Sequence, residues 1–279
     1  MFRRILVPTD GSEQAFKSLK YAIGWAKETQ GVVVSLYVID IKLLEGPLFR
    51  DVGNILEIAP LTNYQNQIQS LLEERGKKAL NISEAECIKN NIPCEKILQI
   101  GIVSTTILEQ SELCDIVIMG KSGEHARWSE GFLGGTTQAV IRRSKRPIII
   151  TNQSEFRRGP FLLAYDASSS AREALRISAE LAKLWETPCH IVYVSNPPEE
   201  EILNEAINCL KTKQVPFFSH LVQDSFPVSG ILNTAKEIKA ELIVMGAFGK
   251  NRLYEWLLGS NTRSVIHEST YPVLLTRLN

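Results

Sequence analysis

The sequence has few of the residues that usually carry catalysis or bind metal. Its five cysteines are an odd, scattered set without a CxxC pair, which argues against a disulfide framework or a zinc site and predicts reduced thiols. The G-x-S-x-G elbow of serine hydrolases and the G-x4-G-K-[ST] P-loop are both absent. The four histidines share no ligand spacing: His125, His190, His220 and His267. No catalytic residue is therefore predicted, and no set of metal ligands can be named from the sequence.

The sequence also lacks a net charge and a long apolar run. Lys+Arg and Asp+Glu both number 31, so no overall field favours nucleic acid or an anionic membrane surface. No apolar run of about 18 residues and no signal-peptide core is present, so we expect a cytoplasmic protein without a membrane span. A hydrophobic content of 44% over 279 residues is ordinary for a globular protein of two domains.

What the sequence does contain is an internal repeat. Four segments recur in the same order, which chance does not readily produce. The pairs are Ile5–Ser12 with Leu162–Ser168, Tyr37-Val38 with Tyr193-Val194, Asp115–Gly123 with Glu241–Gly249, and Arg146–Thr151 with Tyr271–Thr276. The repeat predicts two domains, 1–152 and 159–279, joined by the polar linker Asn152–Gly159.

The two copies differ in length in one place. Asp10 and Asp166 are as far apart as Tyr37 and Tyr193, whereas Gly120 and Gly246 are closer, so the first copy carries about 30 extra residues. We place this insertion near 41–70, chiefly Leu43–Ile68, where Gly46-Pro47 and Ala59-Pro60 interrupt the pattern. We expect it to cover the strand ends of the first copy.

Within each copy, short apolar runs alternate with segments of helical spacing. This order predicts an α/β fold with a parallel sheet covered by helices on both faces. In the first copy we expect strands at 2–8, 32–39, 94–100, 115–119 and 147–151, and helices at 12–30, 63–91, 104–113 and 136–144. In the second we expect strands at 161–165, 190–195, 216–223, 241–245 and 272–276, and helices at 168–185, 199–213, 228–239 and 259–269.

Ligands of such sheets bind beyond the carboxyl ends of the strands, where the strand order reverses. In the second copy this place carries Gly246-x2-Gly249-x9-Gly259-Ser260. Glycines allow a positive φ and a close approach of backbone N–H groups to an anion, and a helix start favours phosphate. The hydroxyls beside Asn261 could add donors. The alternative is that the glycines only form turns.

Other strand-end residues fit the remaining parts of a nucleotide. Asp166 could accept a hydrogen bond from a ribose or hold a metal-bound water, and Val194 and Met245 could flank an adenine. The alternative for Asp10 and Asp166 is that they cap the following helices. Four basic residues of the glycine loops could reach a phosphate, although such residues are usually only solvated: Lys121, Arg127, Lys250 and Arg252.

The strand-end aspartate, the Met-Gly pair and the glycine motif together resemble the ATP-binding branch of the universal stress protein family. The resemblance spans both copies. It implies two tandem doubly wound, five-stranded parallel-sheet domains of the Rossmann-like adenine nucleotide alpha hydrolase type, and ATP, with or without Mg, as ligand. The matching residues of the second copy are Asp166, Val194, Met245, Gly246, Gly249, Gly259, Ser260, Asn261 and Thr262. Those of the first are Pro8, Thr9, Asp10, Val38, Met119, Gly120, Gly123, Gly134, Gly135, Thr136 and Thr137.

Both copies depart from the family pattern. In the first, ten residues separate Gly123 from Gly134, and Gly135 stands where Ser or Thr is expected, so that Thr136 and Thr137 would have to donate. In the second, Ala164-Tyr165-Asp166 replaces Pro8-Thr9-Asp10.

The resemblance favours an ATP-binding, stress-linked sensor or regulator without fast catalysis. The alternatives are an interaction protein with one or both sites empty, and a slow ATPase. Single-domain members of that family commonly pair through their final strands, so the resemblance implies that 146–151 and 271–276 pair within this chain as an internal pseudo-dimer. Any further homodimer would then use other surfaces.

Overall fold

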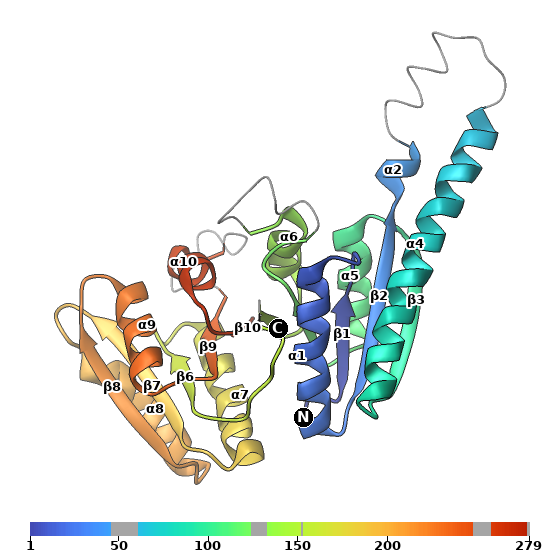
Figure 1. The fold of residues 1–279 in the computed structure, drawn as a ribbon. Coiled ribbons are helices and arrows are strands. Elements are labelled where there is room, and N and C mark those ends of the chain that lie inside the picture. The colour runs from blue at the N-terminus through green and yellow to red at the C-terminus, as the bar shows by residue number, and fades with distance from the viewer. Residues whose placement is uncertain (46–60, 124–132, 152, 248–257, 278–279) are drawn as a thin grey trace.

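The computed structural model describes residues 1–45, 61–123, 133–151, 153–247 and 258–277. Strands and helices alternate along these ranges as the sequence predicts (Figure 1). The strands are β1 (Arg4–Pro8), β2 (Val32–Asp40), β3 (Cys94–Gly101), β4 (Ile116–Met119), β5 (Ile148–Ile150), β6 (Phe161–Ala164), β7 (Cys189–Ser195), β8 (Phe217–Gln223), β9 (Leu242–Gly246) and β10 (Val273–Thr276). The helices are α1 (Glu13–Thr29), α2 (Ile41–Glu45), α4 (Leu61–Lys89), α5 (Val103–Glu112), α6 (Gly135–Arg143), α7 (Ser169–Trp185), α8 (Glu200–Thr212), α9 (Pro227–Glu237) and α10 (Ser260–Glu268).

The strands form one sheet in the order β3-β2-β1-β4-β5-β10-β9-β6-β7-β8. Neighbours within each set of five are parallel, and in each set the strand order reverses at the first strand, β1 or β6. β5 and β10 join the two halves in antiparallel fashion, with Leu274 opposite Ile149. The internal pseudo-dimer through the final strands is therefore confirmed.

Helices cover both faces of the sheet, and the central strands are apolar because side chains project into both layers. In β1, Ile5 and Val7 belong to the core under α1, α4, α7 and α8, whereas Leu6 belongs to the core under α5, α6, α9 and α10. All three side chains are fully buried.

The first helix of each half begins in the same way. The side chains of Ser12 and Ser168 accept hydrogen bonds from the backbone N–H groups of Ala15 (3.2 Å) and Ala171 (3.1 Å). Both helices end in a left-handed residue, Gln30 and Glu186. This repeated capping fixes the position of each helix relative to the strand that precedes it.

The halves differ most in the helix that precedes the third strand, which is α4 in the first half and α8 in the second. α4 has 29 residues and α8 has 13, and the first turns of α4 run on past the ends of the strands (Figure 1). α2 and the beginning of α4 lie in the predicted insertion, and residues 46–60 of it fall outside the described residues. The extra length of the first copy is thus partly helix.

The linker contacts both halves. The ring of Phe156 lies edge-on to Trp25 and to Trp185, with centroids 5.4 and 5.8 Å apart, and to Tyr21 at 5.5 Å. A Cβ atom on Gly24 would come within 2.5 Å of Phe156, so α1 needs a glycine at this contact. The exact domain boundaries, 1–152 and 159–279, stay predictions.

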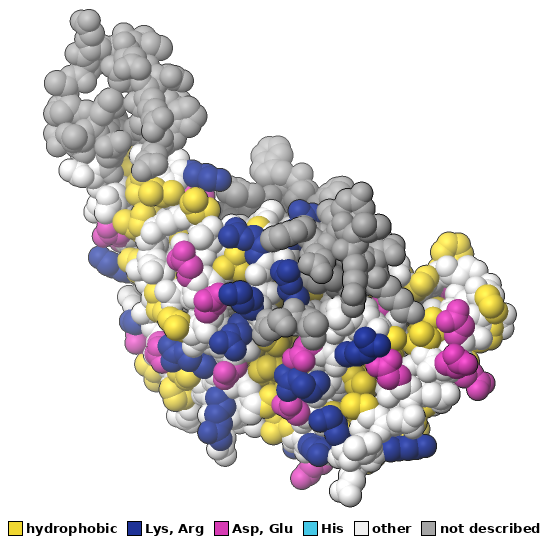
Figure 2. Space-filling model, turned by 180° about the vertical axis from the view of Figure 1, so that it is seen from behind, with side chains coloured by type: hydrophobic (Ala, Val, Ile, Leu, Met, Phe, Trp, Pro, Cys, Tyr) yellow, Lys and Arg dark blue, Asp and Glu magenta, His cyan; other side chains and the backbone are white. Residues whose placement is uncertain are grey.

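The surface is mixed in charge. Figure 2 shows Lys and Arg side chains interspersed with Asp and Glu on the face seen from behind, in keeping with the equal counts of the sequence. Among the described helices, none is both long enough and apolar enough to cross a membrane.

Candidate functional site

The carboxyl ends of the first-half strands enclose a cavity of about 520 Å³. It lies where β1 and β4 are neighbours and the chain turns away to opposite sides, which is where open α/β sheets bind ligands. Its apolar wall includes Val38, Val103, Ile107, Met119 and Leu133. All the first-copy residues of the predicted site line it: Pro8, Thr9, Asp10, Val38, Met119, Gly120, Gly123, Gly134, Gly135, Thr136 and Thr137.

Asp10 lies just before α1, and one of its carboxylate oxygens accepts a backbone hydrogen bond. Its Oδ1 accepts from the backbone N–H of Ser12 at 2.9 Å, while Ser12 itself caps the helix. A Cβ on Gly123 would lie 2.5 Å from Asp10 Oδ2, so only glycine lets this loop approach the carboxylate. Asp10 thus shapes the turn and also faces the cavity, while the capping function belongs to the serine.

The start of α6 forms the opposite side of the cavity. The backbone N–H of Gly134 donates to the carbonyl of Lys121 at 2.9 Å, which leaves the N–H groups of the next three residues as the unpaired start of the helix. A Cβ built on Gly135 would meet nothing within 4 Å. A compact anion could therefore reach the positive end of the helix there.

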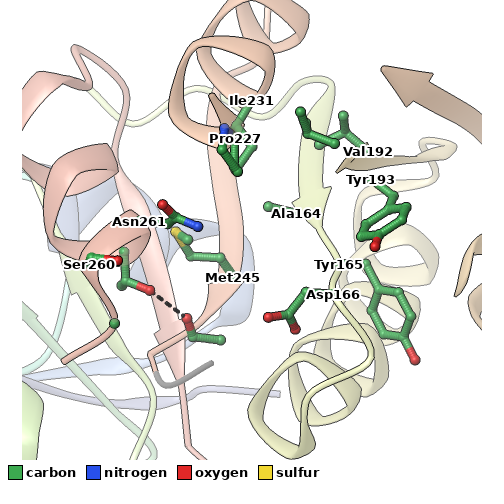
Figure 3. A pocket seen from close by; sticks show the side chains of 14 residues that line it. Ala164, Tyr165, Asp166, Val192, Tyr193, Pro227, Ile231, Met245, Ser260 and Asn261 are labelled. Atoms are coloured by element: carbon green, nitrogen blue, oxygen red, sulfur yellow. Dashed lines mark hydrogen bonds between the residues drawn. The ribbon is translucent and has the colours of Figure 1, made fainter. Parts of the chain in front are cut away.

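The second half carries a smaller cavity of about 190 Å³ at the equivalent place. In Figure 3 the Asp166 carboxylate faces Met245, Ser260 and Asn261 across it. Its lining includes nearly the whole second-copy set: Asp166, Val194, Met245, Gly246, Gly259, Ser260, Asn261 and Thr262. Asp166 Oδ1 accepts from Ser168 N at 2.9 Å, as Asp10 does from Ser12.

Two features of the second cavity replace those of the first. Tyr165 stands where the first copy has Thr9, and its phenol ring points away from the cavity (Figure 3), 2% exposed. Burial raises the pKa of this phenol, and Glu205 adds to the rise. Pro227 takes the place of Val103 at the start of the lining helix, while Ile231 corresponds to Ile107.

The structure corrects the role expected of two hydroxyls. Thr137 donates to the carbonyl of Gly120 and Thr262 to that of Gly246, both at 3.1 Å, and both side chains are buried. These bonds tie the helix start to the strand end. Because a hydroxyl has a single proton to donate, neither threonine has a proton left for a ligand. Thr136 and the exposed Ser260 are the hydroxyls left near the helix starts.

The reason for the glycines is also corrected. Among the described glycines only Gly11 has a positive φ, at +80°, while Gly134 and Gly259 have φ of −57° and −54°. Space decides instead: a Cβ on Gly246 would collide with Ser170 and lie 2.8 Å from the backbone nitrogen of Ala171. At Gly123 and Gly246, lack of space for a Cβ atom, and not a left-handed backbone, requires glycine.

Lys121 lies in the glycine loop but its side chain turns to the other half. Its ammonium group donates to the carbonyls of Ser269 (2.7 Å) and His267 (3.3 Å) at the end of α10. Burial lowers the pKa of this amine. Arg277 makes a related contact, donating to the carbonyl of Arg142 at the end of α6 at 2.9 Å. Lys121 therefore caps a helix and does not reach toward a phosphate.

Several residues named from the sequence lie outside the described ranges. They are Gly249 of the second glycine motif, His125, and the basic residues Arg127, Lys250 and Arg252. No group of three or more His, Cys, Asp or Glu side chains in the described part of the chain could hold a metal ion.

Sequence reasoning missed part of the first cavity. Leu43 of α2 and Leu72 and Arg75 of α4 form one side of it, and all three come from or next to the insertion. The available signal was the position of the insertion after β2, which put it near the strand ends. Which of its side chains would face the cavity depends on the helical phase of α4.

Comparison with known proteins gives one consistent result. The model of the universal stress protein family matches residues 1–152 and 198–277, more than half of the chain. The chain belongs to the universal stress protein family. It is 27% identical to a universal stress protein of Synechocystis sp. over 99% of this chain and 100% of that protein. A universal stress protein of Methanocaldococcus jannaschii is 28% identical over 55% of this chain and 96% of its own length.

The solved structures agree on the fold of this universal stress protein. A universal stress protein from Archaeoglobus fulgidus covers 99% of both chains with a TM-score of 0.76 at 24% identity. The tandem arrangement is thus shared by relatives of full length, whereas the Methanocaldococcus protein corresponds to about half of this chain.

Proposed function

We propose that this universal stress protein binds ATP at the strand ends and acts as a nucleotide-dependent regulator of a stress response without fast catalysis. One observation carries the proposal: in the first cavity a carboxylate, an apolar wall and the unpaired start of a helix face one space of about 520 Å³. That volume lies within the roughly 300–1,000 Å³ of typical small-molecule sites.

Each part of this space suits one part of an adenine nucleotide. Val38 and Met119 offer apolar surface to a base, Asp10 can accept hydrogen bonds from ribose hydroxyls, and the N–H groups after Gly134 can donate to phosphate oxygens. The second cavity repeats the pattern with Val194, Met245, Asp166 and the start of α10. A magnesium ion, if carried, would arrive with the phosphates.

The proposed lack of fast catalysis rests on the residues that face the cavities. Both linings contain aspartates but no described histidine, cysteine or lysine side chain. Asp10 and Asp166 each use one oxygen in a turn at the start of a helix, a structural duty that suits binding better than proton transfer. The cytoplasmic location expected from the sequence belongs to the same proposal.

Mass spectrometry of nucleotides released from the purified full-length protein tests the proposal, followed by calorimetric titration with ATP. ATP bound at one or two equivalents, with phosphate release far slower than ligand exchange, is the expected result. A chain that never binds ATP would instead be the interaction protein kept as an alternative. Rapid release of phosphate would make it an ATPase.

A further inference from the structure

The two cavities differ in the charge of their linings. In the first, the described lining holds two carboxylates, Asp10 and Asp40, and a single cation, Arg75. In the second, the described lining holds Asp166 and no cation. An anionic ligand in the first cavity would meet two negative charges, so a nearby positive charge is needed to offset them.

Arg75 is brought there by the extra length of α4. The left-handed turns at Asn91 and Gln214 each precede a proline by two residues and mark equivalent points of the two copies. Counting back equally from these turns places Arg75 opposite Pro198, which lies ahead of the first residue of α8. The second copy therefore has no helix at this place, and its equivalent residue, Pro198, carries no charge.

The packing of α4 places Arg75 beside the first cavity. A Cβ on Gly76 would lie 2.6 Å from Leu98 and 2.8 Å from Tyr37, so the glycine lets α4 press against β2 and β3. One turn further on, Ala79 lies against Gly11. Arg75 is thereby held over the β1–α1 turn, where its Nη2 donates to the backbone carbonyl of Asp10 at 3.4 Å.

We propose that Arg75 is a specificity-determining residue of the first site and contacts the phosphates of the nucleotide there. The inference rests on the proposed function, since it concerns the same cavity. It makes the two sites chemically unequal: the first recognises the charge of the phosphates with a guanidinium, and the second recognises them with the backbone N–H groups and hydroxyl of the α10 start. The first site should accordingly discriminate more strongly between ATP and adenosine.

The test uses the full-length protein carrying Gly259→Val, which places a branched side chain in the second cavity, so that the first site dominates binding. ATP and adenosine are measured as competitors of a fluorescent ATP analogue. In this background Arg75→Gln should lower the affinity for ATP at least about tenfold, the scale of a lost charge-assisted hydrogen bond. It should change the affinity for adenosine by less than about twofold.

Lys78→Gln is the matched control, because it removes the same charge from an exposed position of α4 that does not line the cavity. Equal ATP affinity of the Arg75→Gln and Lys78→Gln proteins would overturn the inference. An equal loss for ATP and adenosine would also overturn it, because Arg75 would then act on the shape of the site. Failure of the protein without substitutions to bind ATP would refute the proposed function itself, which separates the two failures.

Discussion

At the scale of single residues, the open position of Gly135 offers the cleanest way to block the first site. Most glycines around the cavities touch another group where their Cβ would be, so substituting them would disturb the fold. Gly135 lines the cavity and meets nothing within 4 Å, and it is the first residue of α6, where a side chain is tolerated. The two effects of a substitution, on folding and on binding, can therefore be separated here.

We expect Gly135→Val to keep the midpoint of thermal unfolding within about 2 °C of that of the natural chain. The affinity of the first site for ATP should fall at least about tenfold, because the isopropyl group would occupy the space in front of the helix start. Gly135→Ser, which copies Ser260 of the second half, serves as the control and should bind ATP nearly as the natural chain does. Calorimetric titration and thermal melting measure both quantities. Unchanged ATP binding by the valine variant would remove the start of α6 from the site.

We expect two neighbouring histidines to make the stability of the second half depend on pH. His190 Nδ1 and His220 Nε2 are 3.1 Å apart, and burial lowers the pKa of both imidazoles, with the neighbouring His220 lowering that of His190 further and Glu237 opposing the shift at His220. In the unfolded chain a histidine titrates near pH 6.5. As the pH falls through about 6.5 the unfolded chain therefore binds more protons than the folded one, and stability is lost.

The predicted result is a lower urea midpoint at pH 5.5 than at pH 7.5, with a smaller difference in His220→Gln than in the natural protein. His267→Gln, which changes an exposed histidine at the end of α10, should keep the full difference. A His220→Gln protein with the same pH dependence as the His267→Gln protein would show that the pair does not carry the effect.

At the scale of elements, the linker packs against both halves in addition to connecting them. Phe156 sits among Tyr21, Trp25 and Trp185, which belong to the first helices of both halves. We expect Phe156→Ala to lower the free energy of unfolding by about 2 kcal/mol, below the usual cost for a fully buried phenylalanine because this side chain is half-buried.

Phe226→Ala is the control for that measurement, since Phe226 is 72% exposed. Urea denaturation of both variants gives the comparison. If the two substitutions cost the same, the aromatic cluster contributes nothing that a surface phenylalanine does not.

The sequence predicted the elements well wherever hydrophobic periodicity was strong. The nine-residue strand β2 and the 17-residue helix α7 lie within one residue of their expected ends. α2 was missed, because five residues between a strand and a glycine-proline pair carry too little periodicity to indicate a helix. The two sets of strand-end residues could be brought together in advance, because parallel strands share one carboxyl edge.

Contacts that depend on side-chain direction could not be predicted from the sequence. Lys121 reads as a loop cation near phosphate, yet it caps α10, because the antiparallel pairing of β5 with β10 brings that helix end to the loop. Thr137 reads as a donor to a ligand, yet its bond to Gly120 is decided by the depth at which α6 packs. Both depend on how elements dock, which local sequence does not encode.

At the scale of the whole molecule, β5 and β10 would each be a bare edge in an isolated half. Ile148, Ile149 and Ile150 face Leu275, Leu274 and Val273 across this pairing, and all six side chains are almost fully buried. A protein made of residues 159–279 alone would expose backbone groups and apolar side chains along β10. We expect it to self-associate, and sedimentation at several concentrations measures this.

The full chain under the same conditions is the reference, since its β10 is already paired. A stable monomer of residues 159–279 would mean that the β10 edge is protected in some other way, and the pairing would then not be needed for the second half to stay in solution.

The contacts of Lys121 and Arg277 have a consequence for communication between the halves. The carbonyl of Lys121 holds the beginning of α6, while its ammonium group holds the end of α10, a helix whose beginning lines the second cavity. Arg277 holds the end of α6 in turn. We expect a ligand that shifts the start of α6 or α10 to shift the whole short helix, and with it the contact that the helix end makes with the other half. Thermodynamic reciprocity would then require that ATP at either proposed site change the affinity of the other site by the same factor, so we expect the two sites to be coupled.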